Sequence, residues 1–185
     1  MPVKTYKPTS PGIRHMATPT FEEITKSKPE KSLLVRIKRH AGRNFRGKIT
    51  VRHQGGGARK QYRMIDFNSV DKLNIEAKVK AVEYDPNRTA YIMLLQYPDG
   101  EKRYQIAPEG IKVDDIIVTR EKAKVKNGNR MMLKNIPIGY NIYNVEFHKG
   151  KGGQIVRTAG SSAKLVSLEG EYAQVQMPSG EIRLI

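Results

Sequence analysis

The sequence of 185 residues contains no cysteine and no tryptophan, and no run of about 18 apolar residues occurs in it. Without cysteine there is no disulfide framework and no cysteine-ligated zinc site. The first residues, Met1 to Tyr6, also lack the apolar core of a secretory signal. These absences predict a soluble protein of a reducing compartment that is neither exported nor bound to a membrane.

Motifs of catalysis and metal binding are missing as well. The histidines are His15, His40, His53 and His148. Their separations match neither a His-x3-His nor a His-Glu-x-x-His zinc spacing. Asp114-Asp115 is an adjacent carboxylate pair, and in the strand expected there its side chains would point to opposite faces. The sequence predicts no enzyme, no cofactor, no metal and no small-molecule substrate.

Acidic side chains are scarce in the first 63 residues, where sixteen Lys and Arg face only Glu22, Glu23 and Glu30. This segment carries +13 of the formal net charge of +16, so residues 64–185 are close to balanced. Five scattered prolines prevent a long helix in it. We therefore predict that residues 1–63 form an extended nucleic-acid-binding segment, which takes its shape only around RNA.

After residue 64, closely spaced Gly and Pro turns separate short apolar stretches, which predicts an all-β fold. A short strand is expected at 32–38, and a first set of strands at 77–84, 89–97, 101–107 and 111–119. A polar connection at 120–134 leads to a second set at 141–147, 154–158, 163–168, 172–177 and 181–185. The predicted organisation is an extended segment over 1–63, one β domain over 64–122 and another over 123–185.

Two glycine-rich basic segments are candidates for phosphate binding, because glycine lets the backbone approach a phosphate closely. The first has Gly55-Gly56-Gly57 between Arg52 and the basic residues Arg59, Lys60 and Arg63. A flexible linker would have the same composition. The second, residues 148–153, is followed by Arg157, and a plain hairpin loop would look much the same.

Arg88 is expected at the tip of the turn Asp85-Pro86-Asn87-Arg88, where its side chain would project from the rim of the fold toward RNA or solvent. The predicted strands also contain four tyrosines, which are Tyr84, Tyr91, Tyr97 and Tyr104. Strand tyrosines can stack on bases, but we interpret these four as core or rim residues because that is the commoner role.

Five separated motifs occur in a defined order. They are Lys7-Pro8-Thr9-Ser10-Pro11-Gly12, Arg52-His53-Gln54-Gly55-Gly56-Gly57 with Tyr62-Arg63, Tyr84-Asp85-Pro86-Asn87-Arg88, Asn135-Ile136-Pro137-Ile138-Gly139, and Gly150-Lys151-Gly152-Gly153-Gln154 with Arg157-Thr158-Ala159-Gly160. Together they closely resemble the family of bacterial-type large-subunit ribosomal protein L2. The resemblance runs from the first residues to the last.

The resemblance implies an oligonucleotide-binding (OB) barrel followed by an SH3-like barrel, with an extended basic N-terminal segment. It implies a structural role in the large ribosomal subunit, where the partners are large-subunit ribosomal RNA and neighbouring ribosomal proteins. The expected location is the cytoplasmic ribosome, with an organellar ribosome left open. Residues and resemblance together predict RNA contacts at Arg43, Arg46, Arg52, His53, Lys60, Arg63, Arg88, Lys149, Lys151 and Arg157.

The resemblance also implies a glycine-, histidine- and arginine-rich extension beyond the position of Ile185, near the peptidyl-transferase region. The sequence stops within the last expected strand. We therefore expect an SH3-like barrel that is incomplete at its C-terminal end, in a truncated chain without that extension.

Two other classes of protein stay open at this point. One is a translation or transcription factor that binds the ribosome transiently through OB and SH3-like modules, although a long basic tail is hard to release. The other is a phosphate-handling enzyme that uses the Gly55-Gly56-Gly57 loop, although the spacing of a nucleotide-binding P-loop is missing.

Overall fold

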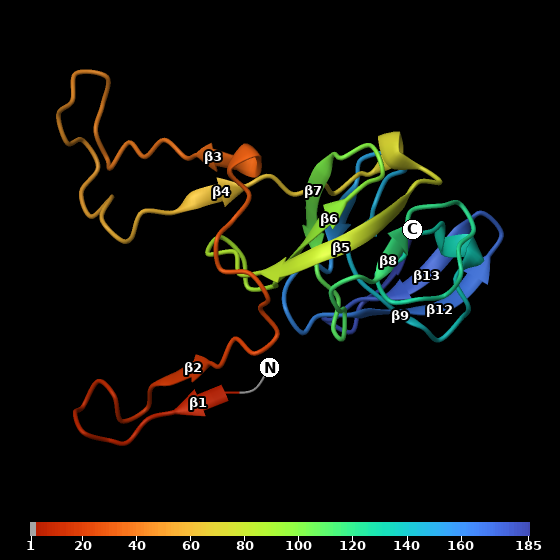
Figure 1. Cartoon of the computed structure of the whole chain (residues 1–185), viewed down its shortest axis with the longest axis horizontal. Coiled ribbons are helices and arrows are strands. Elements are labelled where there is room, and N and C mark those ends of the chain that lie inside the picture. The colour runs from red at the N-terminus through yellow and green to blue at the C-terminus, as the bar shows by residue number, and fades with distance from the viewer. Residues whose placement is uncertain (1–2) are drawn as a thin grey trace.

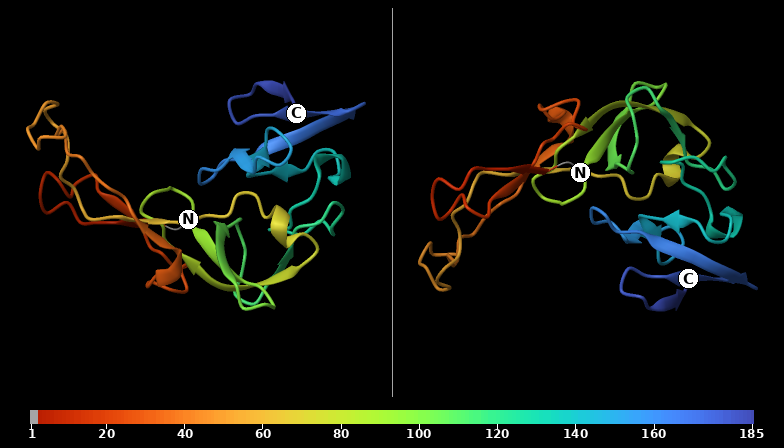
Figure 2. Two further views of the ribbon diagram at one scale, coloured as in Figure 1. Left: turned by 90° about the horizontal axis from the view of Figure 1, so that it is seen from above. Right: turned by 90° about the horizontal axis from the view of Figure 1, so that it is seen from below.

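The computed structural model describes residues 3–185, which contain β-strands, three short 3-10 turns and no α-helix. Two β-sheets pack beside each other, and two hairpin arms extend from them to one side (Figure 1). Views from above and below separate the two sheets and show both arms leaving on the same side (Figure 2). The predicted all-β class is confirmed. No helix within residues 3–185 has the length and apolar character needed to cross a membrane.

The first sheet is antiparallel with the strand order β7-β6-β5-β8. Its strands are β5 (Glu76–Glu83), β6 (Ile92–Gln96), β7 (Lys102–Ile106) and β8 (Ile116–Val118). All four predicted strands are present. The last is shorter than expected because Asp114 and Asp115 lie in the turn before it, with Asp114 at a φ of +72°.

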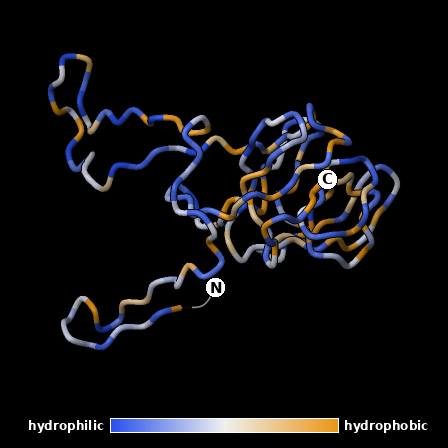
Figure 3. Tube along the Cα trace, viewed as in Figure 1, coloured by the Kyte–Doolittle hydropathy of each residue, from blue (hydrophilic) through white to orange (hydrophobic). Residues whose placement is uncertain are grey.

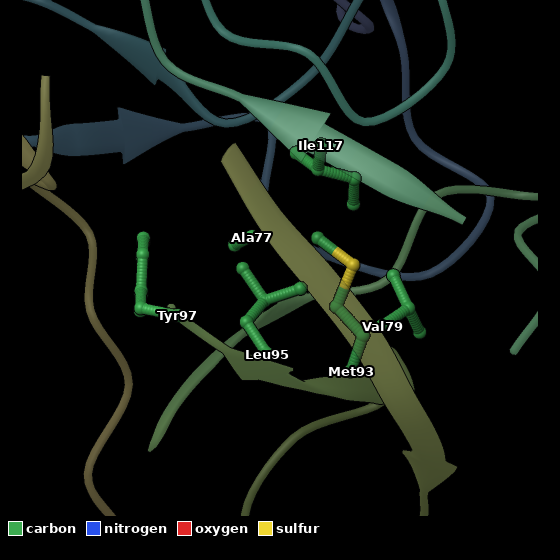
Figure 4. Close-up of a cluster of buried hydrophobic side chains, with 6 residues drawn as sticks. All are labelled: Ala77, Val79, Met93, Leu95, Tyr97 and Ile117. Carbon is green, nitrogen blue, oxygen red and sulfur yellow. The ribbon is translucent and has the colours of Figure 1, made fainter. Parts of the chain in front are cut away.

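Strand β6 is buried on both of its faces, as its apolar alternation predicted. Met93 and Leu95 join a core with Ala77, Val79 and Ile117, which Figure 4 shows in close-up. The alternate residues of β6 point to the other face of the sheet. There, Ile92 and Leu94 pack with Ala81 and Tyr104 in a second cluster, which Leu33 and Ile65 cover from outside the sheet. The segment before the sheet therefore completes its packing.

The second sheet has the order β14-β13-β12-β9 and is accompanied by the short pair β10-β11. The strands are β9 (Asn141–Ile142), β10 (Val145–Glu146), β11 (Gly153–Ile155), β12 (Ala163–Glu169), β13 (Tyr172–Gln176) and β14 (Ile182–Leu184). The single strand expected over 141–147 is wrong. Asn144 has a φ of +51°, which breaks the extended backbone, so β9 pairs with β12 while β10 pairs with β11.

The last predicted strand is present as β14. It pairs with β13, and Ile185 adds two backbone hydrogen bonds to Ala173, at 2.8 and 3.0 Å. Ile185 also packs against the core of the second sheet, around Leu165 and Val175.

Both arms are hairpins that the sequence pattern did not predict as such. The first pairs β1 (Val3–Thr5) with β2 (Ala17–Pro19), and the second pairs β3 (Leu34–Arg36) with β4 (Gln61–Arg63). The strand expected over 32–38 is shortened because a 3-10 turn, η1 (Lys31–Leu33), occupies its start. Apolar residues concentrate in the two sheets, whereas the arms are mainly hydrophilic (Figure 3).

Part of the N-terminal segment is built into the first sheet. Thr25 exchanges hydrogen bonds with the backbone of Val82, at 2.9 and 3.0 Å. The backbone N–H of Glu30 donates to the hydroxyl of Tyr104 at 2.8 Å, and Lys102 contacts the Glu30 carboxylate at 3.1 Å. The expectation that all of residues 1–63 take shape only around RNA is therefore wrong for the parts that cover the sheet.

Tyr104 allows a test of this docking. It is fully buried, and its hydroxyl donates to Glu83 Oε2 at 2.7 Å while it accepts from Glu30. Burial raises the pKa of Glu83, although the Tyr104 hydrogen bond works in the opposite direction. Tyr104→Phe leaves two groups without this partner, so the free energy of unfolding should fall by about 2 kcal/mol.

Urea denaturation measures this loss. The matched control is Tyr84→Phe, because Tyr84 is half exposed and packs its ring against Phe21. This control should unfold at the parent's urea concentration. Equal effects of the two substitutions would show that the Tyr104 hydroxyl does not hold the N-terminal segment on the sheet.

Candidate nucleic-acid interface

The loop of the second arm, residues 37–60, is rich in cationic side chains and contains no acidic ones. It holds eight Lys and Arg residues and two histidines, and the sequence from 31 to 63 contains no Asp or Glu. Five of the predicted RNA-contact residues lie here, and all five are exposed. They are Arg43, Arg46, Arg52, His53 and Lys60. No carboxylate of the arm itself neutralises them, so the loop presents its positive charge to the surroundings.

Arg39 gives this loop its shape, and sequence reasoning did not single it out. Its guanidinium donates to the carbonyl oxygens of Gly56 at 2.9 Å and Ala58 at 3.1 Å. These two hydrogen bonds hold the glycine run against the opposite side of the loop. Gly55 has a φ of +98°, and an added Cβ would lie only 2.8 Å from the Cβ of Ala41. The glycine run therefore has a defined conformation here, whereas the flexible-linker interpretation assumed a mobile one.

Asp85 organises the base of the same arm. Its side chain is completely buried, and it accepts from Arg88 Nε at 2.6 Å and from the backbone N–H of Asn87 at 2.9 Å. Arg63, at the end of β4, approaches it with Nη1 at 3.7 Å. A buried carboxylate needs such partners, because an unpaired charge inside a protein is costly. Asp85 thus ties the arm to the turn after β5.

Two predicted RNA-contact residues are consequently in unexpected positions. Arg88 was expected to project from the rim, which is wrong, because its side chain folds back onto Asp85 and is only 16% exposed. Arg63 is only 8% exposed. Both arginines have a structural partner, and their contact with RNA stays a prediction. The turn chemistry located Arg88 correctly but did not reveal the buried acid beneath it.

Phe67 joins the two sheets through a ladder of alternating aromatic rings and guanidinium groups. Arg88 lies 6.0 Å from the ring centre of Tyr62 and 5.9 Å from that of Phe67. Arg157, which follows β11, lies 4.7 Å from the Phe67 ring centre. The contacts have cation–π geometry. They bring the predicted residues Arg88 and Arg157 to the same ring, although 69 positions separate them in the sequence.

Hydrogen bonds to backbone carbonyl oxygens reinforce this junction. The carbonyl oxygen of Phe67 accepts from Arg130 Nη1 at 2.8 Å and from the N–H of Gly153 at 2.9 Å. Asn68 donates to the carbonyl of Gly150 at 3.1 Å. These contacts hold the basic loop 148–153 against the junction, with Lys149 and Lys151 exposed beside it. A Cβ at Gly152 would lie 2.9 Å from the Phe67 carbonyl oxygen, so glycine permits this approach.

Other cations are already paired and contrast with the arm. Arg103 contacts Asp66, Asp71 and Glu101, and Lys72 contacts Asp99 and Glu101. Hydrogen bonds from Arg103 hold the pKa values of Asp71 and Glu101 below their usual range. These cations are neutralised within the first sheet. Several cations of the first sheet are thus neutralised by neighbouring acids, whereas the cations of the arm loop have no acid on the arm to pair with.

The tyrosines and the acid pair also have clear positions. Tyr91, Tyr97 and Tyr104 are buried, whereas Tyr84 is half exposed, which agrees with the core or rim interpretation. Burial raises the pKa of Tyr97 to about 12.

The carboxylates of Asp114 and Asp115 bind Lys78 and Lys126, at 3.0 and 3.1 Å. Within residues 3–185, no group of three or more His, Asp or Glu side chains is arranged to hold a metal.

The buried charge of Asp85 can be tested by Asp85→Asn. This change leaves Arg63 and Arg88 without their anion, so the free energy of unfolding should fall by about 3 kcal/mol in thermal or urea denaturation. Asp99→Asn is the control, because it removes the carboxylate of an exposed pair with Lys72 and should cost much less. Equal losses in the two variants would refute a structural role for the Asp85 cluster.

Comparison with known protein families agrees with the geometry. Residues 30–119 match the family model described as Ribosomal Proteins L2, RNA binding N-terminal domain. Residues 126–185 match the model described as Ribosomal Proteins L2, C-terminal domain. The first of these domains is an OB barrel and the second is an SH3-like barrel, as the resemblance predicted. The chain belongs to the ribosomal protein L2 family and is a ribosomal RNA-binding structural protein.

Proposed function

We propose that the protein is a structural component of the large ribosomal subunit, where it binds and stabilises large-subunit rRNA and supports subunit association and translation. Its partners there are the rRNA and neighbouring ribosomal proteins, in the cytoplasm or in an organelle. The proposed division of labour follows the extended segment 1–63, an OB unit over 64–122 and an SH3-like unit over 123–185.

The observation that carries this proposal is the segregation of charge. Eleven Lys and Arg residues and no Asp or Glu lie between residues 31 and 63, and the exposed loop holds most of them. RNA is the polyanion that such a loop suits, because each phosphate accepts a cation and gives up a counterion. The arm also reaches away from the two sheets, so it suits a crevice in a folded RNA (Figure 1).

The junction between the sheets supplies the second proposed surface. Lys149, Lys151 and Arg157 are exposed there, beside the aromatic ladder at Phe67. Because contacts from both barrels fix the backbone of this region, it offers a rigid surface, which suits docking on an RNA helix. Arg63 and Arg88 support this surface from beneath and offer only their remaining donors to RNA. The proposed mechanism combines charge neutralisation by the arm with rigid docking by the junction.

The first test concerns the arm. Removing three charges together, as Arg43→Gln, Arg46→Gln and Lys48→Gln, should weaken binding to transcribed large-subunit rRNA. It should also reduce the slope of log affinity against log salt by about 2, because about 0.7 is lost for each phosphate contact. Filter binding over a salt series measures both effects.

The control for this test removes the same charge from exposed lysines of the two barrels, as Lys80→Gln, Lys112→Gln and Lys164→Gln. Its slope should change by less than half as much. A salt-independent affinity of the parent would refute the proposed function, and equal slopes for the two triple variants would refute the special role of the arm.

The second test separates the two arginines at Phe67. Arg157→Gln should weaken rRNA binding several-fold and leave the thermal unfolding temperature nearly unchanged, because Arg157 is exposed. Arg88→Gln should weaken binding and also lower the unfolding temperature, because Asp85 loses its closest partner. Filter binding and circular dichroism give the two readouts. If both variants bind as the parent does, neither arginine contacts RNA.

A further inference from the structure

Phe45 lies at the tip of the second arm in a turn that Asn44 organises. The side-chain oxygen of Asn44 accepts the backbone N–H groups of Arg46 and Lys48, both at 3.0 Å, and Gly47 closes the turn with a φ of +76°. Phe45 itself is 91% exposed, which is the largest value for any large hydrophobic side chain within residues 3–185. The protein therefore holds a bare aromatic ring at the end of a shaped loop.

Phe45 is far more exposed than the other exposed aromatic side chains, which are Phe21, Tyr84, Tyr140 and Tyr172. Phe21 and Tyr84 pack against each other edge to face, with ring centres 5.5 Å apart. Tyr172 is 59% exposed but follows Glu171 and pairs with Glu169 across the β12–β13 hairpin. Phe45 has only the guanidinium of Arg46, whose central carbon lies 5.2 Å from the ring centre. Exposed apolar surface of this kind often marks a contact with a partner.

The charge around the ring indicates which partner. Arg43, Arg46 and Lys48 surround it in the sequence, and no acid lies between residues 31 and 63. A nucleobase offers a flat π surface for the ring, and the phosphates on either side of it offer anions for the three cations. An apolar pocket on a protein would satisfy the ring and leave the three cations without partners. The tip therefore favours a nucleotide.

We propose that Phe45 stacks on an unpaired base of the bound RNA, while Arg46 lies against the ring and reaches an adjacent phosphate. This inference rests on the proposed function and adds a contact of a different kind to the phosphate contacts of the arm. The base must be unpaired, as in a loop or bulge, because bases inside an RNA duplex are stacked and its major groove is too narrow for this side chain.

The experiment compares two probes on the full chain. Phe45→Ala should lower the affinity for transcribed large-subunit rRNA about tenfold, in the range expected for one lost stack. The affinity for a long-chain inorganic polyphosphate should stay at the parent's value, because polyphosphate has charge but no bases. Phe45→Trp keeps a flat ring and should retain RNA affinity. Tyr172→Ala is the matched control, and it should change neither affinity.

The outcomes distinguish this inference from the proposed function. If Phe45→Ala binds rRNA as tightly as the parent while the triple charge variant of the arm binds weakly, the stacking contact is refuted and the proposed function stands. If Phe45→Ala loses rRNA and polyphosphate affinity equally, the ring only shapes the arm, which also refutes stacking. If Phe45→Ala binds free rRNA normally but fails to enter reconstituted subunits, the ring contacts a protein instead. A parent chain without rRNA affinity would refute both proposals.

Discussion

The buried carboxylate of Asp85 connects parts of this protein that are distant from one another in the sequence. A fully buried anion must be neutralised, and the arginines that approach it come from two places. Arg63 ends the strand that returns from the second arm, and Arg88 ends the turn after β5. Arg88 then meets Phe67, whose other cation, Arg157, belongs to the SH3-like barrel. One charge therefore links the arm, the OB barrel and the junction between the barrels.

The same electrostatic requirement explains how the basic residues are distributed. On the OB barrel, cations such as Arg103 and Lys72 lie among carboxylates and gain local partners. The loop 37–60 has no acids, so its charges repel one another and favour a conformation that extends away from the body. This repulsion is unfavourable in the isolated protein, and a bound polyanion would remove it. The positive charge is thus placed where only a partner can neutralise it.

Local patterns in the sequence predicted the barrels well and the arms poorly. The alternation of β6 and the turns around it gave the strands of the first sheet, because burial on each face leaves a periodic signal. The arms bury little, so their hairpins leave no such signal. Arg88 was placed at a turn correctly, but its partner Asp85 and the ladder to Arg157 depend on contacts across long distances in the chain. A pattern of neighbouring residues cannot show which buried group a side chain will meet.

Because the N-terminal segment is docked on the first sheet, RNA binding has to order only part of this segment. Because β6 is apolar on both faces, the OB barrel needs Leu33 and Ile65 as a cover for the cluster around Tyr104. Thr25 and Glu30 fix the same segment by hydrogen bonds, so the bases of the arms are set by the protein alone. Only the loops beyond the paired strands are left to adapt. A smaller ordering cost on binding follows, because the bases of the arms are positioned before the RNA arrives.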